Sequence, residues 1–155
     1  MVDDMTTEPT ERIALFPGSF DPFTIGHKSL VDRALPLFDR IVIAVGENSG
    51  KSSASPAEAR VEEIARLFAA EPRISVTAYS GLTVDACRRA GARWLLRGVR
   101  SLSDFEYEKN LADINRRISG IETVLLYTLP EYAPISSSVV RELARYGYDV
   151  DSFLP

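Results

Sequence analysis

Short apolar runs alternate with longer amphipathic segments along most of this chain. Five of the runs predict buried strands, at residues 12–16, 41–45, 74–78, 94–96 and 123–128. Between them, helical periodicity predicts helices that begin near Gly26, Ser55, Leu82 and Ser103, and a last helix that begins at Ser136 or Ser137. Apolar strands joined by helical crossovers are typical of a parallel sheet covered on both faces. The pattern therefore predicts a single-domain α/β fold of the doubly wound, Rossmann-like kind, with a five-stranded parallel sheet and helices on both faces.

Capping signals refine the ends of these helices. Ser55, Pro56 and Glu58 predict an N-cap, a first-turn proline and a first-turn acid for the second helix. Ser103 with Glu106 predicts a capping box at the start of the fourth helix. Glycines that follow a helical run commonly end it at a positive φ, and three glycines occupy such positions: Gly91, Gly120 and Gly147.

Composition limits the kind of protein this can be. The 155 residues, 45% hydrophobic and 26% charged, predict one domain over residues 12–155 after a flexible polar tail, residues 1–11. A formal net charge of −4 offers no general attraction to nucleic acid or to an anionic membrane, and no apolar run approaches the roughly 18 residues of a membrane-spanning helix. The single cysteine, Cys87, excludes an intramolecular disulfide, so a cytoplasmic protein is expected, and its apolar neighbours predict a packing role.

In a parallel α/β sheet, ligands bind beyond the carboxyl ends of the strands. The first such end, residues 17–27, is a turn rich in Gly and Pro that opens a helix at Gly26 and His27. A helix N-terminus can hold a polyphosphate on its free N–H groups, with the Ser19 hydroxyl and the His27 imidazole as further donors. A lone histidine is often structural, but the position of His27 favours phosphate contact. The helix dipole should disfavour the charged imidazolium until a triphosphate binds.

Basic and hydroxyl-bearing side chains follow three of the other strands. Residues 46–52 resemble the end of a Walker A loop but have three residues between the glycines instead of four, so we retain only Lys51, as a point charge suited to phosphate. After the fourth strand, the guanidinium groups of Arg97 and Arg100 match phosphate geometry, although solvated arginines are the alternative. The serines at residues 136–138 can cap the last helix or donate to a nucleotide, and the two uses are compatible.

Taken together, these residues resemble the phosphopantetheine adenylyltransferase family of the HxGH nucleotidyltransferase superfamily, over residues 12–155. The turn at residues 17–22, with Gly26 and His27, is shared across the superfamily. Its combination with three later blocks is specific to the family: residues 97–100, 104–108 and 135–138.

The resemblance implies two sets of ligand contacts. For ATP it implies Ser19, Phe20, His27, Gly98, Val99, Arg100, Glu108, Tyr132, Ala133, Pro134, Ile135, Ser136, Ser137 and Ser138. For 4'-phosphopantetheine it implies Ser19, Lys51, Leu82, Thr83, Arg97 and Asn115, and the catalytic residues are expected to be Ser19, His27, Lys51 and Arg100. Ser19 replaces a commoner threonine, Thr83 replaces a larger apolar residue, and residues 53–55 lack an aromatic side chain. The contacts of the pantetheine arm should therefore differ, while the reaction is retained.

The implied reaction is in-line attack by the phosphate of 4'-phosphopantetheine on the α-phosphorus of ATP, without a covalent enzyme intermediate. It gives dephospho-coenzyme A and pyrophosphate, a step of coenzyme A biosynthesis. A phosphate monoester with a second pKa of about 6 is mostly dianionic at pH 7, so no general base is needed. Mg²⁺ is expected to bind mainly through the ATP phosphates, with no metal site built by the protein. The resemblance also implies a homo-oligomer, a hexamer of two trimers, and feedback inhibition by coenzyme A.

Two alternatives remain open. A sister nucleotidyltransferase with nicotinamide mononucleotide or glycerol 3-phosphate as acceptor would share the first turn, although the later blocks argue against it. A nucleotide-sensing module without catalysis would keep the adenine and phosphate contacts but need not retain Lys51 and His27 together.

Overall fold

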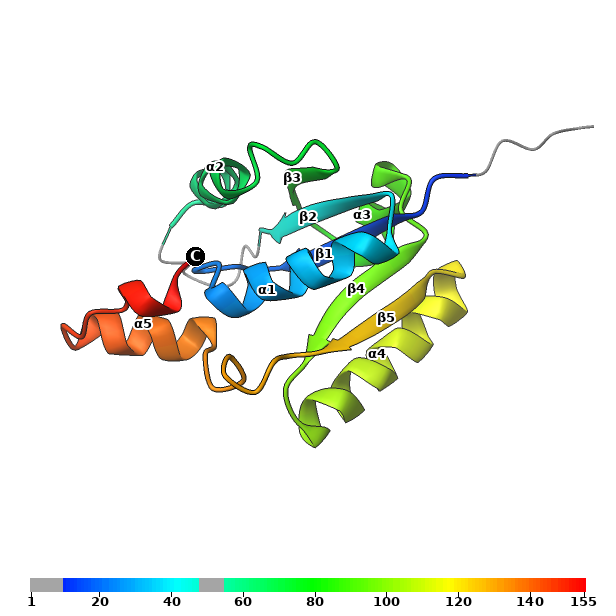
Figure 1. Ribbon diagram of the computed structural model, residues 1–155. Helices are drawn as coiled ribbons and strands as arrows, with labels where there is room; N and C mark the ends of the chain where they lie inside the picture. Colours follow the sequence, from blue (N-terminus) through cyan, green and yellow to red (C-terminus); the bar gives the residue numbers. More distant parts are fainter. Residues whose placement is uncertain (1–9, 48–54) are drawn as a thin grey trace, which may run out of the picture.

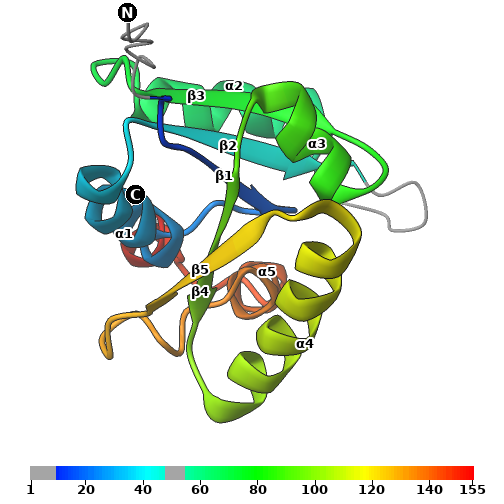
Figure 2. The same cartoon turned by 90° about the vertical axis from the view of Figure 1, so that its right-hand side faces the viewer.

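The computed structural model describes residues 10–47 and 55–155, and within them the chain forms a single parallel sheet with helices on both faces (Figures 1 and 2). Its strands are β1 (Ile13–Gly18), β2 (Arg40–Gly46), β3 (Ile74–Tyr79), β4 (Trp94–Val99) and β5 (Glu122–Tyr127). They lie in the order β3-β2-β1-β4-β5, with every neighbouring pair parallel. The predicted five-stranded, doubly wound fold is confirmed. Most of the predicted tail, residues 1–9, and the predicted phosphate ligand Lys51 lie outside the described residues.

The helices are α1 (Ile25–Ala34), α2 (Ala57–Leu67), α3 (Thr83–Ala90), α4 (Leu102–Ser119) and α5 (Ser137–Arg145). Figure 2 shows α1 on one side of the sheet and α3 and α4 on the other. In Figure 1, α5 lies beyond the carboxyl ends of the strands, away from both faces. Among the described helices, none combines the length and apolar character needed to cross a membrane.

The central strands are apolar on both sides because each side faces a different core. In β1, Phe16 packs in a cluster with side chains of α1 and α2, and the preceding Leu15 packs in a second cluster with side chains of α3. Successive strand residues point to opposite faces, so one apolar run supplies both clusters. The buried Cys87 belongs to the second cluster, and burial raises the pKa of its thiol to about 11. Its predicted packing role is confirmed.

Two predicted helix starts are wrong by one or two residues. Pro56, not Ser55, occupies the N-cap position of α2, and no side chain caps that helix. Ser101, not Ser103, caps α4: its extended backbone lets its hydroxyl accept the N–H three residues further on at 3.2 Å, so the box with Glu106 does not form. The predicted glycines do adopt positive φ values, 70° at Gly91, 77° at Gly120 and 80° at Gly147. The first two cap α3 and α4, and the third follows the C-cap of α5.

Candidate active site

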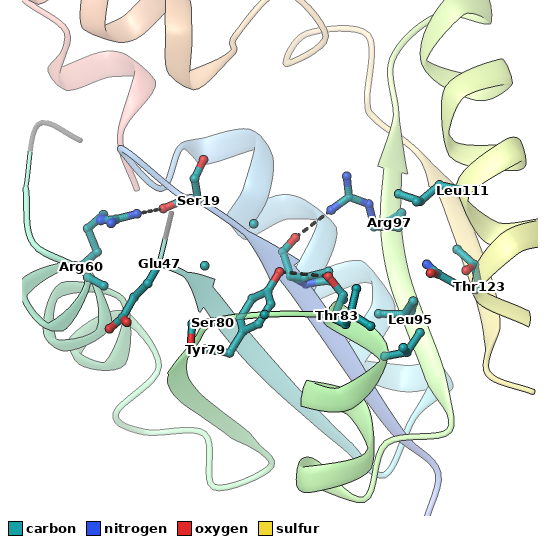
Figure 3. A pocket seen from close by; sticks show the side chains of 18 of the residues that line it. Ser19, Glu47, Arg60, Tyr79, Ser80, Thr83, Leu95, Arg97, Leu111 and Thr123 are labelled. Carbon is teal, nitrogen blue, oxygen red and sulfur yellow. Dashed lines mark hydrogen bonds between the residues drawn. The ribbon is translucent and has the colours of Figure 1, made fainter. Parts of the chain in front are cut away.

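Two neighbouring cavities lie where the strand order reverses, at the carboxyl ends of β1 and β4. The smaller cavity, about 310 Å³, is enclosed by the turn between β1 and α1, the end of β4 and the start of α5. The larger cavity, about 890 Å³, extends over the ends of β2 and β3 toward α3 and α4 (Figure 3). Four residues line both cavities: Pro17, Gly18, Ser19 and Arg97. The parallel fold therefore produces a two-part site at the place that the sheet topology predicts.

The turn between β1 and α1 is tight and conformationally strained. A Cβ added at Gly18 would lie 2.8 Å from the ring of Phe20, so only glycine fits there. Phe20 has a φ of 48°, a left-handed conformation that costs a non-glycine residue about 1–2 kcal/mol. Its buried ring is held edge-to-face against the rings of Phe16, Phe23 and His27, with centroids 5.1, 5.2 and 5.1 Å away. The turn thus carries exposed Ser19 between a half-buried glycine, Gly18, and the buried Phe20.

Carbonyl oxygens of this turn accept hydrogen bonds from side chains of three other elements. Among the described residues, four such pairs, donor first, are Arg97–Pro17, Arg60–Ser19, Arg141–Asp21 and Ser137–Pro22. The donors belong to β4, α2 and α5. Three of the four donors are guanidinium groups, so the contacts that fix the turn also place positive charge around it.

The ring orientation of His27 follows from the start of α1. The N–H of Thr24 donates to Nδ1 of His27 at 2.9 Å, while the Thr24 hydroxyl accepts from the His27 N–H at 3.4 Å. Because Nδ1 is an acceptor, the neutral ring carries its proton on Nε2, which leaves a donor on a side chain that lines the small cavity. Burial, together with the charges of Arg100 and Arg97, lowers the pKa of His27 from 6.5 to about 4. The expected preference for the neutral ring is correct in direction, with burial as its main cause.

Arg97 is paired with Glu108 at the boundary of the two cavities. Its Nε and Nη2 donate to the two carboxylate oxygens at 2.9 and 2.6 Å, and its Nη1 donates to the Pro17 carbonyl at 2.9 Å. Burial alone would lower the pKa of Arg97, but the hydrogen bonds and charge of Glu108 raise it. Three of the five guanidinium N–H groups are therefore used inside the protein, and two remain for a ligand.

The strand β4 is longer than predicted, and this changes the place of Arg97. Residues 97–99 pair with residues 125–127 of β5, so Arg97 belongs to the strand and not to a loop beyond it. Arg100 comes directly after the strand, lines the small cavity and donates to Asp104 at 3.3 Å.

The serines at the start of α5 have separate structural partners. Ser136 caps the helix by accepting the Val139 N–H at 3.2 Å, and Ser137 donates to the Pro22 carbonyl at 2.7 Å. Ser138 accepts from Arg141 at 3.3 Å. Ser136 and Ser137 also line the small cavity, so capping and ligand contact remain compatible as predicted.

The structure brings many, but not all, of the predicted ATP contacts together. Lining the small cavity are Ser19, Phe20, His27, Gly98, Arg100, Ile135, Ser136 and Ser137. Outside its lining are Val99, Glu108, Tyr132, Ala133, Pro134 and Ser138, and Glu108 lines the large cavity instead.

The predicted acceptor contacts that the structure describes all line the large cavity: Ser19, Leu82, Thr83, Arg97 and Asn115. Lys51 lies outside the described residues, but Glu47 and Pro56, the nearest lining residues on either side of it in the sequence, line this cavity as well. The cavity also includes Tyr79, whose hydroxyl lies 3.1 Å from that of Thr83.

Arg60 is the site residue that the sequence interpretation missed. It is only 4% exposed, lines the large cavity and donates from Nη1 to the Ser19 carbonyl. A signal was available: Ala57, Arg60 and Ile64 form the buried stripe of α2 at helical spacing, so a charged residue occupies a core position.

The described residues do not form a site for a metal ion. No group of three or more His, Cys, Asp or Glu side chains among them is arranged to hold one. The lining of the small cavity consists of hydroxyl, imidazole, guanidinium and apolar groups, with no carboxylate. A metal at this cavity would thus depend on oxygen atoms of the ligand.

Comparisons with known proteins define the class of this protein. The chain matches the cytidylyltransferase-like family over residues 15–143. Together with the parallel sheet and the two-part site, this defines a nucleotidyltransferase.

Named relatives narrow the class further. The chain is 56% identical to the phosphopantetheine adenylyltransferase of Porphyromonas gingivalis, covering 94% of this chain and 95% of that protein. It is 54% identical to that of Phocaeicola vulgatus (93% and 95% covered) and 47% identical to that of Flavobacterium psychrophilum (93% and 95%). The chain belongs to the phosphopantetheine adenylyltransferase family.

Proposed function

We propose that this protein transfers the adenylyl group of ATP to 4'-phosphopantetheine, giving dephospho-coenzyme A and pyrophosphate. The observation that carries the proposal is a pair of cavities joined at Pro17, Gly18, Ser19 and Arg97. A transfer between two phosphate-bearing substrates needs two binding spaces that meet at one point, with hydroxyl and cationic groups there. The larger space, about 890 Å³, suits an extended acceptor.

ATP binds in the small cavity in this proposal, with its phosphates near Ser19, His27 and Arg100. The neutral His27 ring offers its Nε2–H to the phosphate oxygens as charge shifts at the α-phosphorus. Phe20 contributes through its backbone, because its ring is buried among the aromatic side chains of the turn.

The acceptor lies in the large cavity, with its phosphate near Arg97 and its arm near Leu82, Thr83 and Asn115. Lys51, which lies outside the described residues, is the second cation assigned to this phosphate. A phosphate oxygen of the acceptor forms a bond to the α-phosphorus, and the bond from that phosphorus to the β-phosphate oxygen breaks. Pyrophosphate leaves with the electron pair, and no covalent enzyme intermediate forms. The dianionic phosphate is already a nucleophile near pH 7, which fits a site without a base paired to a nucleophilic side chain.

Mg²⁺ is part of the proposal as an ion held by the ATP phosphates. It would neutralise phosphate charge when bound. The residues of the small cavity add donors and cations around the triphosphate but offer no carboxylate ligand to the ion.

Pyrophosphate release tests the proposal directly. With ATP and 4'-phosphopantetheine present, we expect release of pyrophosphate and formation of dephospho-coenzyme A. A panel with CTP in place of ATP, and with nicotinamide mononucleotide or glycerol 3-phosphate in place of the acceptor, distinguishes the sister activities. Nucleotide binding without any pyrophosphate release would instead support the sensing alternative.

Assembly and regulation follow the family expectation. A homo-oligomer, in the form of a hexamer, is supported by an exposed apolar stripe on α4, formed by Tyr107, Leu111, Ile114 and Ile118. Coenzyme A is expected to inhibit by competing with 4'-phosphopantetheine, because it contains the same pantetheine arm. A cytoplasmic location fits the single, buried cysteine.

A further inference from the structure

Arg60 is buried in a way that stability alone does not explain. It lies within α2 on the stripe that faces the core and is 4% exposed, whereas arginine is seldom fully buried. Its Nε is buried and has no acceptor within the part of the chain that the structure describes. A buried guanidinium with an unused donor costs free energy compared with an apolar side chain of similar size.

Among the described residues, the side-chain hydrogen bond of Arg60 ends at the junction of the two cavities. Its Nη1 donates to the carbonyl of Ser19, one of the four residues that line both spaces. Figure 3 shows Arg60 and Arg97 on opposite sides of the large cavity, with Ser19 between them. The two guanidinium groups thus fix the turn from two elements, α2 and β4.

The turn at Ser19 needs such external contacts because it is strained. The residue after Ser19, Phe20, has a φ of 48°, a conformation that persists only where the surroundings determine it. The contacts of the Phe20 ring hold the side chain of this residue. The hydrogen bond from Arg60 to the Ser19 carbonyl holds the peptide bond that precedes Phe20. It therefore fixes the directions of the Ser19 C=O and the Phe20 N–H.

We propose that Arg60 is a positioning residue for adenylyl transfer, acting through the Ser19 carbonyl. This inference rests on the proposed function. Holding the carbonyl sets the place of the Ser19 hydroxyl at the point where the two substrates meet. A displacement of about 1 Å in a positioning group can lower a rate by roughly a hundredfold, so a small relaxation of the turn has a large effect.

Kinetics of Arg60 variants test the inference. We expect Arg60→Met to lower kcat by about ten- to a hundredfold, while the KM values change by less than about threefold. Arg60→Lys keeps a charged donor on a long side chain and should recover a substantial part of kcat. Arg66→Met is the matched control, since Arg66 lies on the same helix, is exposed and pairs only with Glu62 among the described ion pairs; its kinetics should equal those of the unaltered protein.

Amide exchange of the turn gives a second reading that does not depend on turnover. In Arg60→Met, the peptide covering residues 17–23 should exchange faster by mass spectrometry, while peptides of β2 and β4 stay unchanged. If Arg60→Met fails to fold, Arg60→Lys carries the same comparison at smaller amplitude.

Three results would overturn the inference. Normal kcat and KM values for Arg60→Met would assign Arg60 to stability, and a raised KM with normal kcat would assign it to direct substrate binding. Unchanged amide exchange in the turn would show that Arg60 does not fix the turn. Absence of turnover in the unaltered protein would contradict the proposed reaction instead, and the exchange measurement would still decide whether Arg60 fixes the turn.

Discussion

The neutral imidazole beside the small cavity carries its proton on Nε2 because a backbone N–H occupies its Nδ1. The Thr24 hydroxyl and N–H hold the His27 ring at the first turn of α1, so its orientation is set before any ligand arrives. Burial lowers the pKa of the His27 imidazole, and the positive charges of Arg100 and Arg97 lower it further, so the ring stays neutral. His27 is thereby a preorganised donor, which is the property that stabilises developing charge at low reorganisation cost.

Removal of this donor should affect turnover more than binding. We expect His27→Ala to lower kcat by roughly a hundredfold or more, with the Kd of ATP changed by less than about fivefold, because the donor matters most as charge shifts in the transition state. Steady-state kinetics and calorimetry measure the two quantities. Lys28→Ala, a change at the adjacent, half-buried residue that pairs with Asp32, is the control. Equal losses in ATP affinity and turnover would assign His27 to ground-state binding.

The same ring should make the fold sensitive to acid. The unfolded chain binds a proton on His27 near pH 6.5 and the folded chain near pH 4, so between these values the unfolded state binds more protons. Stability from this residue is complete above about pH 6.5 and falls as the pH drops toward 4, by at most about 3 kcal/mol. Denaturant unfolding at several pH values should show a weaker pH dependence in His27→Gln. Parallel curves for both proteins would remove His27 as the cause.

Side-chain identities at the strand ends predicted several of the groups that line the two cavities, because residue type and sequence position carry that information. Ser19, His27, Arg97 and Arg100 line the cavities as expected. What the sequence could not supply is the partner of each group. For example, Arg97 donates two hydrogen bonds to the Glu108 carboxylate. This pairing depends on how α4 packs against β4, which is a tertiary feature.

At the scale of elements, α4 has two distinct features. One is the buried Glu108, paired with Arg97 of β4. Beside it runs a stripe of exposed apolar side chains at spacings of four, three and four residues, Tyr107, Leu111, Ile114 and Ile118, of which Leu111 also lines the large cavity. A run of this spacing is what a helix presents to a packing partner. In this chain the four side chains are exposed and do not belong to the core.

Disruption of the stripe should change the state of assembly. We expect Ile114→Lys to shift the protein to a smaller species, because a buried lysine at an interface between copies is unfavourable. Light scattering coupled to size exclusion gives the mass. Glu106→Gln changes the net charge by the same amount at an exposed position of α4 away from the stripe and should leave the mass unchanged. An unaltered protein that is monomeric at working concentration contradicts the oligomer proposal.

Element boundaries were less predictable than element types. The strands and helices follow from hydrophobic period, but β4 continues to Val99 only because β5 pairs with it there. Ser101 caps α4 in preference to Ser103 for the same kind of reason: where the strand ends decides which serine precedes the helix.

For the whole molecule, the switch in strand order between β1 and β4 places two cavities against one turn. Each cavity is built from a different set of elements, so one substrate's contacts can change while the other's are kept. The chain has a net charge of −4, but three arginines donate hydrogen bonds around one turn. This local positive charge lets an acidic protein bind anionic ligands there.

Removal of divalent metal should abolish turnover and leave the fold intact. In the proposed reaction the ion is held by the ATP phosphates, not by ligands of the protein. We expect excess EDTA to stop pyrophosphate release, with the Tm of the ligand-free protein shifted by less than about 1 °C. Added Mg²⁺ should restore the rate. A large fall in Tm on chelation would show that the protein itself holds a structural metal.

The division of the site between two substrates gives the prediction with the widest reach. Lys51 is assigned to the acceptor phosphate, and described residues on either side of it in the sequence, Glu47 and Pro56, line the large cavity and not the small one. A hydrogen bond to a charged partner contributes about 1.5–3 kcal/mol, so Lys51→Ala should lower kcat/KM for 4'-phosphopantetheine by about ten- to a hundredfold. Calorimetry should find the Kd of ATP nearly unchanged.

Arg97 lines both cavities, and its replacement should therefore behave differently from that of Lys51. Arg97→Lys retains the charge but cannot reproduce the paired contact with Glu108 together with the bond to the Pro17 carbonyl. We expect it to weaken the acceptor most and ATP to a smaller degree, whereas Lys51→Ala affects the acceptor alone. If both variants lose ATP and acceptor affinity equally, the two cavities do not correspond to the two substrates, and the small cavity must be reassigned.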